Sequence, residues 1–596
     1  MSTTLKPTEA GTAFLTTHVS ESANKIFTPE QRDEDQRMFE ESSKTFVERE
    51  VLPNLDAIES QEKGIMPSLL KKAGEQGLLM IEIPEAYGGA ELGLLTSVLV
   101  AAQQKEASFS VAYGAHTTIG TLPIVYYGTE EQKQAYLPKL ATGEWIAAYA
   151  LTEPGVGSDA MGLSTRAELS EDGKFYILNG TKQWISNAGF ADVFVVFARI
   201  GNERPSAFIV EATWPGVTTG PEENKMGIKG SSTRQLILQD VKVPVDNLLG
   251  ELNKGYKIAF NILNIGRLKL GAGTVGGARN ALNLAATYTA ERKAFNKFLH
   301  EFGMIKKKLA RMAAETYAAE SEVFRTAANI ANAQHSAGEN TEAIFKAVED
   351  YAIEASLAKV HGSEVLALVV DEGVQIFGGY GFMKEYPIEK AYRDARIQRI
   401  FEGTNEINRL VASGTLFRRA LKGQVNLMTA FPPVEERIKT NQPLNSAGED
   451  IPAELREAVN ALERAKDATI YAAVNVAMKY MQALEQEEEF IEYLANLLID
   501  LYAIDSAQAR AIQAVRRGDA DSTTHIKLAQ LATWLAFTRI RANLDQLLMS
   551  YIDENRVNKI LERVRAYVGD YTLNGVAIQR EIANIVVEKQ GYPLYS

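Results

Sequence analysis

Glu402 is the residue of this sequence whose surroundings best suit proton transfer. It stands between the apolar pair Ile400-Phe401 and Gly403. A carboxyl group that is partly removed from water has a raised pKa and becomes a stronger base. The segment therefore predicts a general base at Glu402. An ordinary surface glutamate is the alternative interpretation, because the chain contains 76 acidic residues.

The segment Tyr149–Asp159 is rich in residues that form ligand-binding loops. It holds one proline and two glycines, which favour an irregular loop whose backbone N–H groups can face a ligand. Thr152 and Ser158 add hydroxyl donors. A plain turn is the alternative interpretation.

A tryptophan and a serine lie two residues apart in Gln183–Asn187, after a predicted strand pair. The indole of Trp184 can pack against a flat ring while the hydroxyl of Ser186 bonds to the edge of that ring. A core tryptophan is the alternative, and for a lone tryptophan it is the commoner one.

Two later segments offer a cation for phosphate and a backbone that a ligand can approach. Arg292 is a fixed charge that can fork onto a pyrophosphate, and Phe302-Gly303 follow it. The glycines of Gln375–Gly381 permit close approach to the backbone. The alternatives are a solvated charge at a helix end and a helix that ends in a turn.

A further motif, Gly271-Ala-Gly273-Thr-Val-Gly276, matches the spacing of a dinucleotide-binding loop. Such a loop must link a strand to the start of a helix, whereas the residues before these glycines have helical periodicity. We therefore expect the glycines to lie inside a helix, where they let a neighbouring element pack closely.

The composition is that of a globular protein with large cores. Of the 596 residues, 46% are hydrophobic and 23% are charged, which excludes a disordered acidic chain. The net charge of −13 argues against nucleic-acid binding, which rewards a concentrated basic surface. Because the chain has no cysteine, thiol catalysis, disulfides and thiolate metal sites are excluded, and no metal site is predicted.

The hydrophobic pattern predicts an α+β fold that is mainly α. The predicted units are an N-terminal helical domain (1–144), a β-barrel-like domain (145–245), a second helical bundle (246–422), a linker (423–452) and an extra C-terminal helical domain (453–596). Asp172-Gly173 predicts a hairpin, and Pro432-Pro433 interrupts any pattern in the linker. Alternating βαβ units are absent from the pattern, so a parallel sheet is not expected.

A cytoplasmic location is expected. Met1–Ala10 is polar and interrupted by Pro7, so it lacks the apolar core of a secretory signal. We expect no run of about 18 apolar residues to span a bilayer. Basic and apolar residues are mixed between Phe417 and Lys439, a pattern typical of peripheral contact with an anionic membrane. A solvated linker is the favoured interpretation of that segment.

In this order and spacing, the five segments resemble those of the acyl-CoA dehydrogenase family. The resemblance covers residues 28–422, and the C-terminal extension and Phe260–Arg267 are similar to the very-long-chain members. It implies an FAD-dependent oxidoreductase of fatty acid β-oxidation that converts long-chain fatty acyl-CoA to trans-2-enoyl-CoA. It also implies that electrons pass to an electron-transferring flavoprotein.

The resemblance implies a role for each matching residue. Glu402 takes the α proton while the flavin accepts the β hydride. Arg292 reaches FAD across a subunit boundary, which implies a homodimer or a tetramer built from two dimers. The residues implied to contact substrate are Ser158, Arg267 and Gly403. Those implied to bind FAD are Tyr149, Leu151, Thr152, Gly157, Ser158, Trp184, Ser186, Arg292, Phe302, Gly303, Gln375, Gly378, Gly379, Thr404 and Glu406.

Gly266 supports the choice of Glu402 as the base. Some family members carry the base just before the arginine that matches Arg267, and a glycine in that position cannot serve. An acyl-CoA oxidase that uses oxygen and a non-catalytic flavoprotein scaffold are the alternatives. A scaffold needs no base, so Glu402 argues against it. Acyl chain length, branched-chain tolerance and the role of the last domain stay open.

Overall fold

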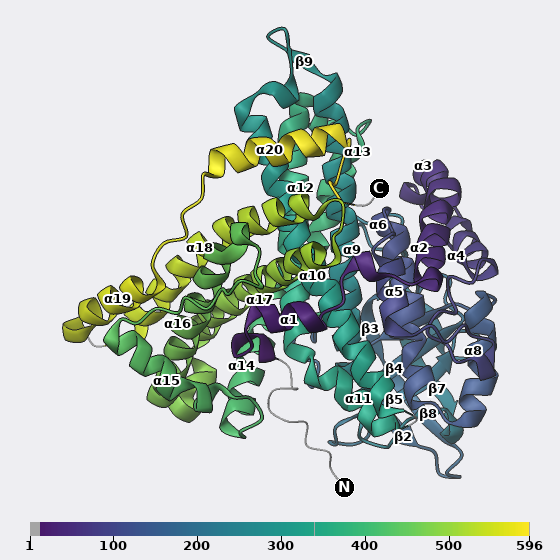
Figure 1. Cartoon of the computed structure of the whole chain (residues 1–596). Helices are drawn as coiled ribbons and strands as arrows, with labels where there is room; N and C mark the ends of the chain where they lie inside the picture. The colour runs from purple at the N-terminus through teal and green to yellow at the C-terminus, as the bar shows by residue number, and fades with distance from the viewer. Residues whose placement is uncertain (1–11, 339, 553, 595–596) are drawn as a thin grey trace.

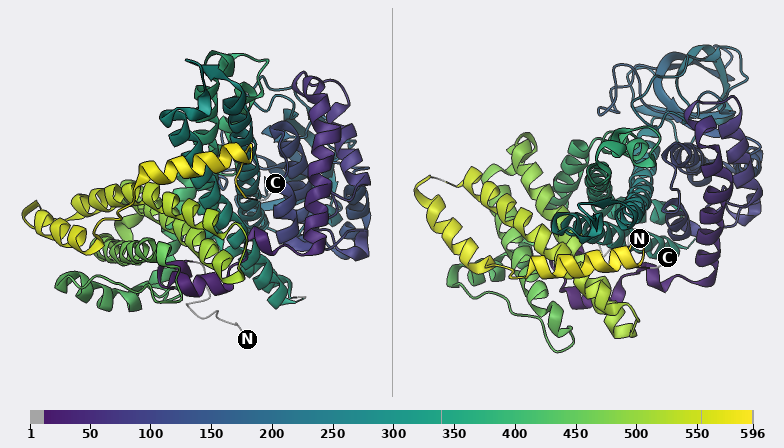
Figure 2. Two further views of the ribbon diagram at one scale, coloured as in Figure 1. Left: turned by 45° about the horizontal axis from the view of Figure 1, so that its top comes forward. Right: turned by 90° about the horizontal axis from the view of Figure 1, so that it is seen from above.

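The computed structural model describes residues 12–338, 340–552 and 554–594. The polar start of the chain, Met1–Ala10, lies outside the described residues. The expected α+β fold, mainly α, is confirmed, with one large sheet among many helices (Figure 1). Seen from above, the sheet and the extra C-terminal helices lie on opposite sides of a central helical bundle (Figure 2).

The N-terminal part of the chain folds into short helices. The α-helices are α1 (Val19–Lys25), α2 (Glu34–Phe46), α3 (Leu55–Glu59), α4 (Ile65–Glu75), α5 (Gly93–Ala101), α6 (Ala107–Gly114), α7 (Leu122–Tyr127) and α8 (Glu130–Thr142). Shorter helical turns are η1 (Ala13–Leu15), η2 (Pro29–Gln31), η3 (Val47–Val51), η4 (Leu52–Asn54), η5 (Glu85–Tyr87) and η6 (Ala115–Gly120). Helix α4 ends at Glu75, and the left-handed Gly77 (φ +76°) lies two residues beyond its end.

The central sheet has eight strands, and most neighbours in it are antiparallel. The strands are β1 (Ala147–Ala150), β2 (Arg166–Leu169), β3 (Phe175–Ser186), β4 (Val193–Arg199), β5 (Pro205–Glu211), β6 (Val217–Thr219), β7 (Thr233–Pro244) and β8 (Leu248–Leu249), with the turn η7 (Val245–Asn247) before β8. Their order is β6-β7-β3-β2-β4-β5-β8, and β1 pairs with β4 in parallel. The β2–β3 hairpin turns at Asp172-Gly173, as predicted. Strands as short as β6 and β8 show no alternation of polar and apolar residues, so the sequence pattern does not mark them.

Long helices form the central bundle. Its elements are α9 (Gly255–Glu291), the hairpin β9 (Lys293–Ala294) and β10 (Lys297–Phe298), η8 (Leu299–Glu301), α10 (Gly303–Ala337), α11 (Thr341–Asp350), α12 (Ala352–Phe377), η9 (Gly378–Phe382), α13 (Pro387–Ala395), η10 (Arg396–Arg399) and α14 (Asn405–Leu421). Helices α9, α10 and α12 pack against one another. One stretch, Ala352–Phe382, is long and apolar enough by length and composition to cross a membrane, which the sequence pattern did not predict. Here it is a core helix of the bundle.

The extra C-terminal helices cover one side of that bundle. They are α15 (Leu427–Thr440), η11 (Ala453–Leu455), α16 (Arg456–Tyr480), η12 (Met481–Gln486), α17 (Glu488–Arg517), α18 (Ser522–Tyr551), α19 (Glu554–Val568) and α20 (Gly575–Glu588). Both α17 and α20 pack on α10, and the N-terminal helix α1 also packs on α17 (Figure 1).

The prediction of an irregular linker over 423–452 is wrong for the middle of that range, where α15 forms. Pro432 and Pro433 lie inside this helix, so they remove backbone hydrogen bonds without ending it. Leu427, Val434 and Ile438 are buried, and α15 packs against α16. Burial of this apolar face outweighs the local cost of the two prolines.

Basic residues of the segment 417–439 are partly used within the fold. Arg437 binds Asp467 at 2.7 Å, and Arg419 donates to the carbonyl of Asp350 at 2.6 Å. These two cations are therefore committed to the protein itself. Membrane contact by this segment stays a prediction.

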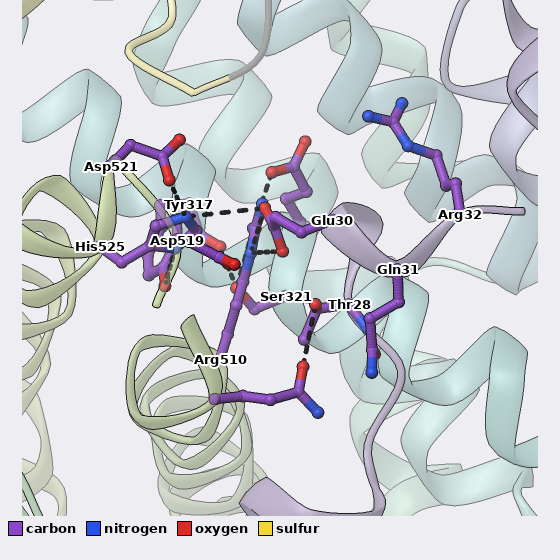
Figure 3. A network of polar contacts seen from close by, with 12 residues as sticks. Thr28, Glu30, Gln31, Arg32, Tyr317, Ser321, Arg510, Asp519, Asp521 and His525 are labelled. Atoms are coloured by element: carbon purple, nitrogen blue, oxygen red, sulfur yellow. Dashed lines mark hydrogen bonds and ion pairs between the residues drawn. The ribbon is translucent and has the colours of Figure 1, made fainter. Parts of the chain in front are cut away.

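Arg510 ties the start of the chain to the central bundle (Figure 3). Its guanidinium, wholly buried, binds Glu30 from η2 and Glu320 from α10, the latter at 2.8 Å. It also lies over the ring of Tyr317, 4.7 Å from the centroid. Burial alone would raise the pKa of Glu30, but Arg510 lowers it to about 2. This network fastens the C-terminal helices and the N-terminal stretch to α10.

The three glycines Gly271, Gly273 and Gly276 all lie inside α9, as predicted. A Cβ on Gly276 would stand 2.2 Å from the carbonyl oxygen of Ala102, and one on Gly271 would stand 3.3 Å from that of Ala358. The small residues therefore permit close packing and do not form a phosphate loop.

We predict that Gly276→Ala destabilises the protein by about 1–3 kcal/mol, because the new methyl group must displace backbone at Ala102. The midpoint of thermal unfolding should fall. Gly414→Ala is the matched control: it lies within α14, its nearest neighbour is a side-chain atom at 3.7 Å, and alanine favours helix. Equal midpoints for the two variants would contradict the packing role of Gly276.

Candidate active site

The turn that carries Glu402 has an unusual backbone. Glu402 (φ +56°) and Gly403 (φ +80°) are both left-handed, between η10 and α14. A non-glycine residue in this conformation costs about 1–2 kcal/mol, so the surroundings must hold it. Arg267 donates to the carbonyl of Glu402 at 3.2 Å, and Asn408 donates to the carbonyl of Gly403 at 2.8 Å.

The carboxyl group of Glu402 is buried and incompletely paired. Among the described residues, its Oε2 has no hydrogen-bond partner. Burial raises its pKa to about 7, although the nearby cations of Arg267 and Lys359 act in the opposite direction. A carboxyl group with this pKa can exchange a proton near neutral pH.

Gly266 makes room for this carboxyl group. A Cβ at Gly266 would lie 2.8 Å from Oε2 of Glu402. The carboxyl group therefore rests on the backbone of α9 one residue before Arg267. The sequence associated Gly266, Arg267 and Glu402 through the resemblance, and the structure brings the three together.

A long cavity starts at Glu402 and follows α9. Its α9 wall is one stripe of residues, namely Gly266, Lys269, Leu270, Gly273, Gly277, Asn280 and Leu284. From first to last this stripe spans about 27 Å of helix. The facing wall includes Ser110, Val111, Gly114, Ala115, Thr118 and Ile119 from α6 and η6. Sequence reasoning missed the residues of both cavity walls. For the α9 wall, the helical spacing of its small residues was a signal that could have found them.

Ser186, at the end of β3, also lines this cavity. Trp184, two residues earlier, is 61% exposed and left-handed (φ +56°). The core interpretation of this tryptophan is therefore wrong. Its exposed indole is available to a flat ring.

The predicted loop Tyr149–Asp159 lies beside β3. The backbone N–H of Gln183 donates to the carbonyl of Thr152 at 2.8 Å, which joins the loop to the Trp184 segment. Tyr149 and Leu151 are buried, and Tyr149 Oη has no partner among the described residues. The loop's outer part is open: Gly157 and Ser158 are exposed, and a Cβ on Gly157 would meet nothing within 4 Å.

A buried ion pair shapes this loop, and its only signal in the sequence is an acid inside a Pro-Gly segment. Glu153 binds Lys182 at 2.8 Å, and both side chains are wholly buried. Glu153 also accepts hydrogen bonds from the hydroxyls of Ser164 and Thr165. Burial would raise the pKa of Glu153, but Lys182 and these hydrogen bonds lower it to about 2.

The residues after Glu402 form the start of α14. Thr404 caps this helix, its Oγ1 accepting from the N–H of Ile407 at 3.3 Å. Glu406 is exposed in the first turn, and its pKa is lowered by hydrogen bonding at the helix start. These two residues therefore lie near Glu402, and their contact with FAD stays a prediction.

A second group of predicted residues lies far from Glu402 within the chain. Arg292 ends α9, about 39 Å along the helix from Gly266, at the tip that carries the β9 hairpin (Figure 1). Its guanidinium lies over Tyr380 at 5.2 Å. The other members of this distal group are Phe302, Gly303, Gln375, Gly378 and Gly379. Within one chain, the distal group around Arg292 and the residues around Glu402 are therefore too far apart to bind the same ligand.

Four domains of one family match most of the chain. The acyl-CoA dehydrogenase N-terminal domain matches residues 33–144, the middle domain matches 148–241, and two C-terminal domain types match 253–416 and 464–566. A probable acyl-CoA dehydrogenase of Bacillus subtilis (strain 168) is 43% identical over 590 residues, 98% of each chain. The chain belongs to the acyl-CoA dehydrogenase family.

Two further relatives agree with this assignment. The crystal structure of an acyl-CoA dehydrogenase complexed with FAD from Bacillus anthracis has a TM-score of 0.95 and 44% identity, and covers 98% of this chain and 99% of that one. The mitochondrial very long-chain specific acyl-CoA dehydrogenase of Bos taurus is 36% identical over 523 residues, 83% of this chain and 76% of that protein. The chain is therefore an FAD-dependent oxidoreductase.

The residues present fit FAD. The exposed Trp184 offers a face for a flat ring, and Ser186 lines the same cavity as Glu402. At the distal group, Arg292 is exposed, and a Cβ on Gly378 or Gly379 would meet nothing within 4 Å, which leaves the backbone open to a pyrophosphate or a nucleoside.

We predict that Gly266→Ala slows flavin reduction by acyl-CoA about 100-fold while FAD stays bound. The added methyl group would overlap the Glu402 carboxyl group and displace it. Stopped-flow absorbance of the flavin measures the rate, with Gly414→Ala as the control. A Gly266→Ala enzyme as fast as that control would mean that the carboxyl group does not act from this position.

Proposed function

We propose that this enzyme oxidises long-chain fatty acyl-CoA to trans-2-enoyl-CoA, with Glu402 as the base that removes the α proton. The observation that carries the proposal is the buried Glu402 carboxyl group, which has an oxygen without a hydrogen-bond partner among the described residues, at the start of the long cavity. A non-catalytic scaffold would have no use for such a group. Burying a carboxyl group without a full set of partners costs free energy, and groups with such perturbed pKa values are concentrated at functional sites.

The chemistry requires the protein to make a weak acid reactive. The α C–H of a thioester loses its proton to a carboxylate only where the site is dry and the carbonyl is polarised. Bound FAD supplies the acceptor for the hydride equivalent that leaves the β carbon. Glu402 receives the α proton and becomes neutral, a form that its buried surroundings favour.

The length of the cavity supports a long acyl chain. A span of about 27 Å along α9 corresponds to an extended alkyl chain of roughly 20 carbons. The three glycines of the stripe have no side chains, so they leave space for a ligand along α9. On the facing wall, a Cβ on Gly114 would meet nothing within 4 Å, so this position is open to a substrate tail.

A second copy of the chain would complete the cofactor site. Because Arg292 and Glu402 lie far apart in one chain, we infer that the distal group of one protomer meets the β3 end of its partner. Phe295 (91% exposed), Met304 (82%) and Phe382 (79%) surround the distal group, and such apolar exposure suits a subunit interface. A homodimer, or a tetramer of two dimers, would follow.

We further propose that electrons leave through an electron-transferring flavoprotein in fatty acid β-oxidation. The exposed Trp184 supplies an aromatic surface beside the proposed flavin position, as interfaces with partner proteins often do. Rapid reoxidation by oxygen with peroxide release would favour the oxidase alternative instead. A cytoplasmic location, with or without peripheral membrane contact, stays a prediction.

We predict that palmitoyl-CoA bleaches the flavin of the purified enzyme under anaerobic conditions, and that Glu402→Gln slows this step about 1000-fold. Glutamine keeps the shape of the side chain but cannot accept the proton, so the variant should stay yellow with FAD bound. Absorbance of the visible flavin band measures both. Bleaching of the Glu402→Gln variant at the parent rate would show that another group is the base.

We predict that Gly114→Phe shifts the preference toward shorter chains. The new ring would occupy the open part of the cavity opposite α9, so kcat/KM for palmitoyl-CoA should fall at least about 10-fold relative to butyryl-CoA. Butyryl-CoA is the internal control, because its short chain ends near Glu402. An unchanged ratio would mean that the acyl chain does not pass Gly114.

A further inference from the structure

Lys359 is a buried lysine in the middle of α12, among the largest wholly buried side chains of the protein. Its ammonium group donates to the carbonyl oxygen of Gly403 at 2.8 Å and to Oδ1 of Asn405 at 2.8 Å. Gly403 and Asn405 lie on either side of Thr404, and Gly403 directly follows Glu402. A buried ammonium group is expensive to desolvate, so its contacts are expected to serve a purpose.

The turn that carries Glu402 is held from three helices. Arg267 on α9 binds the carbonyl of Glu402, Lys359 on α12 binds that of Gly403, and Asn408 on α14 binds the latter as well. The amide of Asn405 extends this attachment, because it donates to Ser363 on α12 at 3.1 Å. The left-handed turn is therefore fixed mainly against α12, with Lys359 at the centre of the contact.

Lys359 also carries charge into the surroundings of Glu402. Burial lowers the pKa of Lys359 to about 7, while the negative charge of Glu402 acts in the opposite direction. The other charged groups that influence it are Arg267 on α9, Glu364 on α12 and Glu406 on α14. The same cation in turn lowers the pKa of Glu402.

We propose that Lys359 is a positioning residue for the reaction: it holds the Gly403 carbonyl and the Asn405 side chain, aims the Glu402 carboxyl group into the cavity and stabilises its ionised form. The proposal rests on the function proposed above for Glu402. Lys359 itself acts through the turn and takes no part in the chemical step.

The test compares Lys359→Met, which removes both the charge and the donors, with Lys359→Gln, which keeps a donor without the charge. Lys308→Met is the control, because Lys308 on α10 pairs with Glu372 on α12, about 20 Å along α12 from Lys359 and away from the Glu402 turn. We expect Lys359→Met to slow flavin reduction by palmitoyl-CoA about 100-fold. Lys359→Gln should lose less and serves alone if the methionine variant does not fold.

The pH profile separates positioning from a general loss of structure. The reduction rate falls when Glu402 is protonated, and loss of the Lys359 cation raises the pKa of Glu402. The acidic limb of the rate profile should therefore move to higher pH in both Lys359 variants and stay in place in Lys308→Met. A merely structural lysine would lower the rate without moving this limb.

Amide hydrogen exchange provides a readout that does not depend on the activity. Amides of residues 400–408 should exchange faster in Lys359→Met than in the parent and in Lys308→Met. If palmitoyl-CoA fails to reduce the parent enzyme, the proposed function is wrong, and this exchange still decides whether Lys359 holds the turn. Parent-like exchange in residues 400–408 together with a parent-like acidic limb would overturn the proposal.

Discussion

The structure depends on keeping one carboxyl group away from water without giving it a full set of partners. The Oε2 atom of Glu402 is buried without a hydrogen bond among the described residues, and the backbone of Glu402 is left-handed. Each of these features costs free energy, and side chains from α9, α12 and α14 hold the group in place. The helical bundle therefore supports this single turn, and the sheet contributes Ser186 to the cavity that Glu402 lines.

Helix α9 serves several needs through its small residues. Gly266 leaves space for the Glu402 carboxyl group, and Gly276 lets the backbone at Ala102 approach. Gly273 and Gly277 lie beside them on the cavity wall. One helix thus supports the proposed base, the proposed acyl cavity and the contact with the N-terminal helices. Its far end carries Arg292, so in the proposed dimer one α9 would contribute to two cofactor sites, its own at Gly266 and the partner's at Arg292.

Much of this arrangement could be predicted from the sequence where the signal is local. The turn at Asp172-Gly173 and the helix end at Gly77 follow from short-range backbone preferences. The interpretation of Gly271–Gly276 as helix interior followed from periodicity. Glu402 was recognisable from its apolar neighbours and from the family resemblance.

The parts that escaped prediction depend on distant contacts. Helix α15 forms despite Pro432 and Pro433 because its apolar face is buried against α16, which local rules cannot anticipate. Lys359 and the Glu153–Lys182 pair look like ordinary charged residues in the sequence, and only the fold buries them. The separation of Arg292 from Glu402 likewise follows from the length of α9.

The most direct test of the account is an infrared difference spectrum between the parent enzyme and Glu402→Gln, recorded as the pH is raised. A protonated carboxylic acid has its own carbonyl band, which the amide of the Glu402→Gln variant lacks. We predict that the band is present in mildly acidic solution and disappears with a midpoint near pH 7, because burial raises the pKa of Glu402 to about 7. Loss of the band near pH 4.5, the ordinary value for a glutamate, would contradict the account.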